Sequence, residues 1–297
     1  MDMARAHNEL QERYRQYRRL HAAWNHNEKA VDRAIKEGTI EGAERPPDFA
    51  SPISEMGDPV GARFVRNTKT SSSIPLVPFH HIEIDLWGPL DVGDRTGNRF
   101  AFAAIDRATG HLWIQPIRAK SEALAAMRNY LRFVDARCPG VEQHLEMMFG
   151  KTFPVRGVAI VSSDRGGEWT VTRGATRSKF EEFMQKRVVH RLNTPKTPKS
   201  GTTRIERAWR TIVKASRQSI IQSGLKKTYW WDAMVLAVDV YNNLPTKANS
   251  LGSGEAPNAT LGINYDLQDI VALGSPTYLC VDGDKAADAM QIVVHLG

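Results

Sequence analysis

The order of strand-like and helix-like segments between residues 81 and 243 is the strongest constraint on the fold of this chain. Ile82, Ile84 and Leu86 alternate with more polar residues, which is typical of a half-buried strand. Two more strand-like runs and an amphipathic helical stripe follow it. A strand, a helix, another strand and two helices complete the order. The segments cover residues 81–86, 99–105, 111–117, 121–137, 158–161, 179–186, 187–192, 203–223 and 229–243. This order predicts an α/β core in which helices flank a mixed five-stranded sheet.

The segments on either side have a different character. Residues 4–38 have the pattern of two highly charged helices, and residues 45–78 contain six prolines and many small polar residues, as a linker does. The tail after residue 265 becomes β-like again. We therefore predict a small helical N-terminal segment, a linker, a core, a second linker and a partial β C-terminal module, over residues 1–60, 61–78, 79–247, 248–270 and 271–297.

Composition excludes several classes of protein. The 297 residues are 41% hydrophobic and 25% charged, as in an ordinary globular protein. No apolar run approaches the ~20 residues that a membrane span needs, and the N-terminus lacks the apolar centre of a signal peptide. Two cysteines, Cys138 and Cys280, make neither a disulfide framework nor a cysteine zinc site. These features favour an intracellular protein without a membrane partner.

Positive charge is concentrated in one part of the chain. Residues 165–227 contain 16 Lys or Arg and four Glu, a formal balance of +12, whereas the whole chain carries +7. Such a zone suits a polyanionic partner, because it attracts phosphates. A solvated basic face is the alternative, and nucleic-acid binding is the interpretation that we favour.

Three carboxylates stand at the ends of predicted elements. Asp85 ends the first strand, Asp164 ends the strand before Arg165-Gly166-Gly167, and Glu206 opens a basic helix. Carboxylate oxygens are the protein ligands that Mg²⁺ prefers, and two ions ~3.5–4 Å apart can serve phosphoryl transfer. We predict that Asp85, Asp164 and Glu206 are metal-binding catalytic residues.

Each carboxylate also has an ordinary structural interpretation. Asp85 can cap a turn, Asp164 can belong to a simple glycine turn, and Glu206 can favour the helix macrodipole. The prediction of a metal site rests on the positions of all three carboxylates taken together. Glu206 also shares a helix face with basic residues at i+4 and i+8, Arg210 and Lys214.

Several motifs, in this order, resemble the integrase of copia-type long-terminal-repeat retrotransposons. The Ser-Asp-x-Gly-x-Glu-aromatic signature of that family is similar to residues 163–169, and its Glu-Arg helix is similar to Glu206-Arg207. The other similar segments are Asp85-Leu86-Trp87-Gly88-Pro89, residues 105–114, Lys120-Ser121-Glu122-Ala123 and Trp230 to Pro245. The resemblance covers roughly residues 80–245.

The resemblance implies an RNase H-like core that processes and joins element cDNA 3′ ends to target DNA. It implies that Asp85, Asp164 and Glu206 bind two Mg²⁺ ions, for which Mn²⁺ can substitute. The expected partners are double-stranded DNA and further copies of the chain, and the expected place of function is the nucleus. The candidate DNA contacts are Lys199, Arg204, Arg207, Arg210 and Lys214.

The flanks extend the resemblance only in part. The family has a His-His-Cys-Cys zinc domain before its core, and His21 and His26 fit its histidine half. The cysteine half falls on Ser51 and Ser54, and serine is a poor zinc ligand. We therefore predict a degenerate domain without zinc. Residues 271–297 resemble the start of the family's SH3-like β module, and we therefore expect this chain to be a fragment or a decayed copy.

Two departures within the core leave other functions open. Residues 170–177 resemble an insertion, and the family's Pro-Gln-x-Asn-Gly before the glutamate is replaced by residues 198–203. A decayed or domesticated integrase that only binds DNA is the first alternative. An RNase H-like nuclease that cuts RNA–DNA hybrids is the second.

Overall fold

A computed structural model describes residues 3–24, 27–47, 49, 77–150, 154–163, 178–187, 189–193, 204–246, 249, 251, 255–263, 270–278 and 292–294. The chain forms two compact units. One unit comprises residues 1–60, 212–240 and 266–297, and the other comprises residues 61–211 and 241–265. The domain boundaries expected from the sequence stay predictions.

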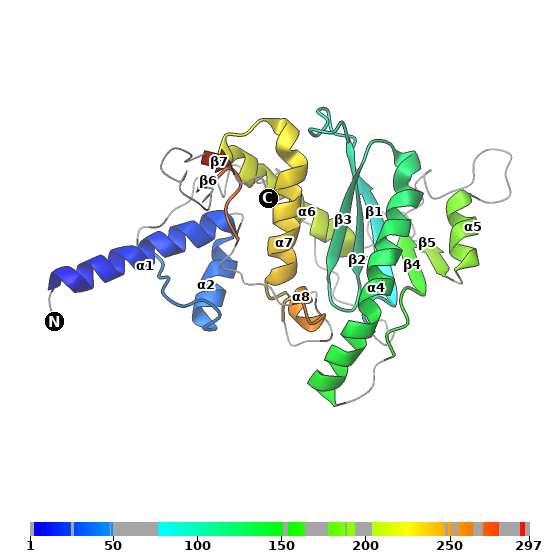
Figure 1. Ribbon diagram of the computed structural model, residues 1–297, viewed down its shortest axis with the longest axis horizontal. Coiled ribbons are helices and arrows are strands. Elements are labelled where there is room, and N and C mark those ends of the chain that lie inside the picture. Colours follow the sequence, from blue (N-terminus) through cyan, green and yellow to red (C-terminus); the bar gives the residue numbers. More distant parts are fainter. Residues whose placement is uncertain are drawn as a thin grey trace, which may run out of the picture. The chain divides into compact units, whose positions relative to one another are not determined.

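A five-stranded mixed sheet forms the centre of the second unit (Figure 1). Its strand order is β3-β2-β1-β4-β5. The first three strands form an antiparallel meander, and β4 and β5 are parallel to β1. The strands are β1 His81–Trp87, β2 Phe100–Asp106, β3 Leu112–Ile117, β4 Ile160–Ser163 and β5 His190–Asn193. This topology confirms the predicted α/β, RNase H-like fold.

Helices follow the strands in the expected order. They are α4 Ala123–Phe149, α5 Lys179–Lys186, α6 Arg204–Ser223, α7 Trp230–Asn243 and α8 Pro257–Thr260, with short 3₁₀ helices η1 Lys120–Glu122 and η2 Lys227–Tyr229. The first unit begins with α1 Met3–Ala23 and α2 Glu28–Lys36, and it contains β6 Pro276–Tyr278, which pairs antiparallel with β7 Ile292–Val294. In the described part of the chain, no helix is long and apolar enough to cross a membrane.

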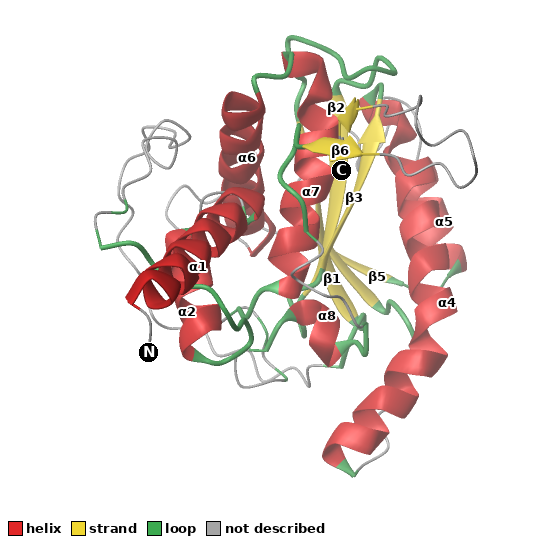
Figure 2. Ribbon diagram, turned by 60° about the vertical axis from the view of Figure 1, so that its left-hand side comes forward, coloured by secondary structure: helices red, strands yellow, loops and turns green. Residues whose placement is uncertain are grey.

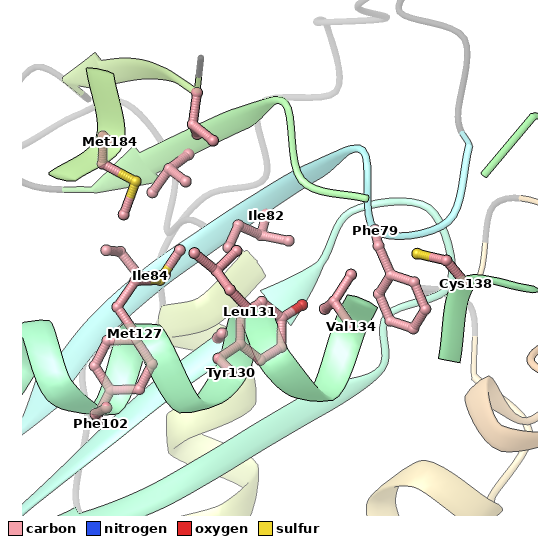
Figure 3. Close-up of a cluster of buried hydrophobic side chains, with 14 of the residues drawn as sticks. Phe79, Ile82, Ile84, Phe102, Met127, Tyr130, Leu131, Val134, Cys138 and Met184 are labelled. Carbon is pink, nitrogen blue, oxygen red and sulfur yellow. The ribbon is translucent and has the colours of Figure 1, made fainter. Parts of the chain in front are cut away.

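One face of the sheet packs against α4 and α5 to form the core (Figure 2). Ile82 and Ile84 of β1 are buried among α4 side chains that include Met127 and Leu131 (Figure 3). Burying each such side chain contributes about 1.5–3 kcal/mol. The alternation of β1 therefore assigns its isoleucines to the core face.

Helix α4 is longer than the sequence pattern predicts. The apolar stripe predicts an end near Arg137, and Pro139, just beyond it, removes a backbone hydrogen bond in a helix interior. The helix instead continues through Pro139 to Phe149, and Gly150 ends it in a left-handed conformation with φ +61°. Val141 and Leu145 remain buried in the core beyond the proline. Their burial outweighs the lost bond.

Asp106 holds the turn after β2 against the start of β1. Its carboxylate accepts the Phe79 N–H at 3.0 Å, the Thr109 N–H at 2.9 Å and the Thr109 hydroxyl at 2.8 Å. Burial raises the pKa of Asp106, while these bonds act in the opposite direction. Asp106 thus has a structural role at the end of the sheet where β1 begins.

Gly88, at the other end of β1, has a close backbone neighbour. Its φ is +120°, and a Cβ there would lie 2.6 Å from the Arg99 carbonyl oxygen. We expect Gly88→Ala to lower the free energy of unfolding by about 3 kcal/mol, from backbone strain plus this contact. Urea unfolding measures the change.

Gly97→Ala is the matched control, because Gly97 also has a left-handed backbone, with φ +88°, but a Cβ there would meet no other atom within 4 Å. It should cost only about 1–2 kcal/mol, the strain of a left-handed residue. Equal losses in the two variants would contradict the steric account of Gly88.

Candidate functional site

Alternate residues of β1 make a polar surface on the side of the sheet opposite α4. Side chains of a strand point to its two faces in turn, so His81, Glu83, Asp85 and Trp87 lie opposite the buried isoleucines. We call these four residues the polar face of β1. His81 and Glu83 are buried, whereas Asp85 and Trp87 are half-buried.

The first turns of α6 lie along this polar face. The Ile205 N–H donates a hydrogen bond to Glu83 Oε2 at 3.1 Å, and the Trp209 ring centroid lies 6.1 Å from that of Trp87. Ile205 and Trp209 are four residues apart and lie on one face of α6. Glu83 and Trp87 are also four residues apart, and they lie on one face of β1. Asp85 lies between these two contacts along β1. Glu206, which follows Ile205 directly, therefore belongs to the turn that covers the polar face, and it is exposed.

A partly buried ion pair, between Arg107 and Glu83, lies at the start of α6. Arg107 Nε lies 3.4 Å from Glu83 Oε1, and the Arg204 guanidinium donates a hydrogen bond to the Arg107 carbonyl oxygen. Burial lowers the pKa of Arg204, and the nearby Arg107 adds to the decrease. Glu83 thus lies beside two cations that come from the β2–β3 turn and from α6.

A side-chain hydrogen bond also links β1 to β4 on the polar face. His81 Nε2 lies 2.7 Å from Ser162 Oγ, and Ser162 is paired with Glu83 in the parallel register. Burial lowers the pKa of His81 to about 4, and the charge of Arg107 acts in the same direction. His81 is therefore neutral at pH 7. Strand β4 ends at Ser163, the residue before Asp164.

The structure describes only part of the predicted site. Asp85 accepts the Leu86 N–H at 2.8 Å, and Glu206 is exposed on α6. Arg207 and Arg210 are exposed on the same helix, whereas Arg204 and Lys214 are half-buried. Asp164 and Lys199 lie outside the described residues. Among those that are described, no three His, Cys, Asp or Glu side chains form a group that could hold a metal. The carboxylate triad stays a prediction.

Sequence reasoning missed the two residues that link the elements. Glu83 and Ser162 carry the contacts of β1 with α6 and β4. The available signal was weak: Glu83 stands two residues before Asp85, on the same face of a half-buried strand. A charged residue on such a face requires a partner. The partner of Glu83 is Ile205, which is 122 residues away in the sequence.

The predicted absence of zinc concerns the other unit. There His21 is buried, its ring is stacked with Tyr17 at a centroid distance of 6.5 Å, and it meets Phe49 edge-on at 4.8 Å. His26, Ser51 and Ser54 lie outside the described residues. The environment of His21 is aromatic, and the prediction of no zinc stays untested.

The buried, neutral state of His81 predicts a dependence of stability on pH. The unfolded histidine binds a proton below pH 6.5, whereas the folded one binds it only near pH 4. Stability is therefore unaffected by this group above pH 6.5 and falls as pH decreases from 6.5 to 4, by about 3 kcal/mol. We expect His81→Gln to lose less stability than the wild type over this interval, as measured by urea unfolding.

His190→Gln is the control, because the side chain of His190 is exposed on β5. It should retain the wild-type pH dependence. If His81→Gln also retained that dependence in full, the account of a buried neutral His81 would be wrong.

Comparison with known proteins gives relatives among transposon proteins. No family model matches the chain. It is 25% identical over 179 residues to the retrovirus-related Pol polyprotein from transposon TNT 1-94 of Nicotiana tabacum. The match covers 60% of this chain and 12% of the relative. The corresponding proteins from transposons RE1 and RE2 of Arabidopsis thaliana are 25% and 26% identical, over 61% and 66% of this chain. The chain spans only 11–12% of the length of these relatives.

Two of the solved structures that match the chain are of viral proteins. The HTLV-2 integrase catalytic core domain in complex with magnesium, in its trimeric form, has a TM-score of 0.41 and 13% identity, covering 62% of this chain and 97% of that chain. A simian T-cell lymphotropic virus intasome in complex with PP2A regulatory subunit B56 gamma has a TM-score of 0.43 and 12% identity, covering 69% and 61%. The predicted resemblance to retrotransposon proteins is confirmed by these relatives, since the chain is similar to a part of retrovirus-related Pol polyproteins, and the strand order is the one that the resemblance implies.

Proposed function

We propose that the chain is an integrase-like polynucleotidyl transferase that processes retrotransposon cDNA 3′ ends and joins them to target DNA. The observation that carries the proposal is the bond between the Ile205 N–H and Glu83 on the polar face of β1. This bond holds the first turn of α6, with Glu206, over the strand face that bears Asp85. The similarity to retrovirus-related Pol polyproteins supports the same function.

The carboxylates fit a divalent metal in their chemistry and exposure. Asp85 is half-buried and Glu206 is exposed, and carboxylate oxygens are ligands that suit Mg²⁺. The parallel register pairs Glu83 with Ser162, and β4 ends at Ser163, which directly precedes Asp164 in the sequence. Two bound Mg²⁺ ions would supply Lewis acidity to the attacking and leaving oxygens of the phosphate. Asp85, Asp164 and Glu206 would hold and orient the two ions.

The basic residues of α6 would position the DNA. Arg207 and Arg210 are exposed on the helix that bears Glu206, and Arg204, Lys214 and Lys199 are the further candidates. Contacts of guanidinium groups with phosphates fix the register of DNA without reading its sequence. We include in the proposal that the chain acts as a homo-oligomer in the nucleus, as the resemblance implies.

Substitution of the carboxylates tests the chemistry. In a strand-transfer assay with short labelled duplexes in Mg²⁺ or Mn²⁺, we expect the wild type to produce joined DNA. Asp85→Asn, Asp164→Asn and Glu206→Gln should each lower the rate by at least about 1000-fold, because each removes a charged metal ligand. The neutral isosteres retain the size of the side chain.

Asp91→Asn is the matched control, since Asp91 is an exposed carboxylate in the loop after β1. It should retain the wild-type rate. If a folded wild type bound DNA but produced no joined or cleaved product, the transferase proposal would be wrong and a DNA-binding role would replace it. Cleavage of RNA–DNA hybrids without joining would instead select a nuclease.

The salt dependence of DNA binding tests the role of α6. The logarithm of the binding constant should fall linearly with the logarithm of salt concentration, and each lost phosphate contact should reduce the slope by about 1. We expect this reduction for Arg207→Gln and for Arg210→Gln, as measured by fluorescence anisotropy with a labelled duplex. Arg132→Gln, an exposed arginine of α4, is the control and should leave the slope unchanged. Unchanged slopes in all three variants would exclude α6 from the DNA interface.

A further inference from the structure

We propose that Glu83 is a positioning residue for the transferase reaction, and that it acts by fixing the first turn of α6, and therefore Glu206, relative to Asp85. The proposal rests on the proposed function and adds a residue to it. Glu83 is the buried carboxylate that contacts α6 from the strand that bears Asp85.

The first link is the hydrogen bond at the start of α6. The first four N–H groups of a helix lack acceptors within the helix, and Ile205 is the second residue of α6. Glu83 Oε2 accepts its N–H at 3.1 Å, so a strand residue supplies the acceptor that a capping residue usually provides. Its negative charge also interacts favourably with the positive end of the helix dipole.

The second link fixes the carboxylate itself. Arg107 Nε lies 3.4 Å from Oε1, so the two oxygens of Glu83 face two different groups. Arg204 extends this arrangement, because its guanidinium donates to the Arg107 carbonyl oxygen. The start of α6 is thus attached to the end of the sheet by Glu83 and by Arg204, which is the first residue of the helix.

The geometry favours a positioning role over metal binding. Glu83 is 7% exposed, and both of its oxygens already contact protein groups. It lies two residues from Asp85, roughly 7 Å along the strand. Glu206, in contrast, follows Ile205 directly and is exposed. Loss of the Glu83 acceptor would release the turn that bears Glu206, and a displacement of about 1 Å at a reacting site can lower a rate on the order of 100-fold.

Hydrogen exchange and kinetics together test the role. Glu83→Ala should speed amide exchange in the segment 204–209 of the metal-free protein, as measured by mass spectrometry. In the strand-transfer assay it should lower kcat roughly 10- to 100-fold, with a smaller change in the KM for DNA, because Arg210 and Lys214 lie beyond the segment 204–209. Glu182→Ala, an exposed glutamate of α5, should change neither quantity.

A double variant separates positioning from metal binding. In Glu83→Gln/Arg107→Gln, the amide oxygen of residue 83 can still accept the Ile205 N–H, and its amide group no longer faces the Arg107 guanidinium. This variant should restore slow exchange at 204–209 and most of the lost kcat. If it were as inactive as Asp85→Asn, the carboxylate itself would be required and the positioning role would be overturned.

The remaining outcomes distinguish the two proposals. Unchanged exchange at 204–209 in Glu83→Ala, or an unchanged kcat, would overturn the role of Glu83 whatever the protein does to DNA. A wild type that joins no DNA would contradict the proposed function, and the exchange measurement would still decide whether Glu83 fixes α6. Circular dichroism and thermal unfolding confirm that each variant is folded before it is compared.

Discussion

The alternation of side chains along β1 is the constraint on which the rest of the core depends. Ile82 and Ile84 point into the layer between the sheet and α4, where both are almost fully buried. His81, Glu83 and Asp85 must then point to the opposite face. A slip of one residue in the register would place carboxylates in the core and isoleucines beneath α6. The hydrophobic face therefore determines where the polar chemistry lies.

The polar face is stable because its buried groups have partners. Glu83 contacts the Ile205 N–H and Arg107, and His81 contacts Ser162. Burying such groups without partners would cost several kcal/mol. The contacts with Ile205 and Ser162 also join β1 to the helix that carries Glu206 and to the strand that precedes Asp164. The same bonds that satisfy buried polar groups therefore order the site.

Local pattern was sufficient to predict the element order and the strand faces. Ile82, Ile84 and Leu86 signal a half-buried strand, and the positions of the flanking helices followed from apolar periodicity. The exact end of α4 could not be predicted, because Pro139 is a local stop signal and the burial of Val141 and Leu145 is a tertiary effect. Local propensity and tertiary burial conflict there, and burial prevails.

Long-range contacts explain why the candidate site was predicted only in outline. The bond between Ile205 and Glu83 joins residues 122 positions apart, and no periodicity within either segment indicates it.

The most direct test of the central claim, that β1 and α6 bring Asp85 and Glu206 to one metal site, is anomalous diffraction from crystals of the protein grown with Mn²⁺. The account predicts manganese peaks within about 2.0–2.3 Å of carboxylate oxygens of both residues, with Asp164 completing the set. Manganese bound elsewhere, with the two carboxylates directed away from each other, would contradict it.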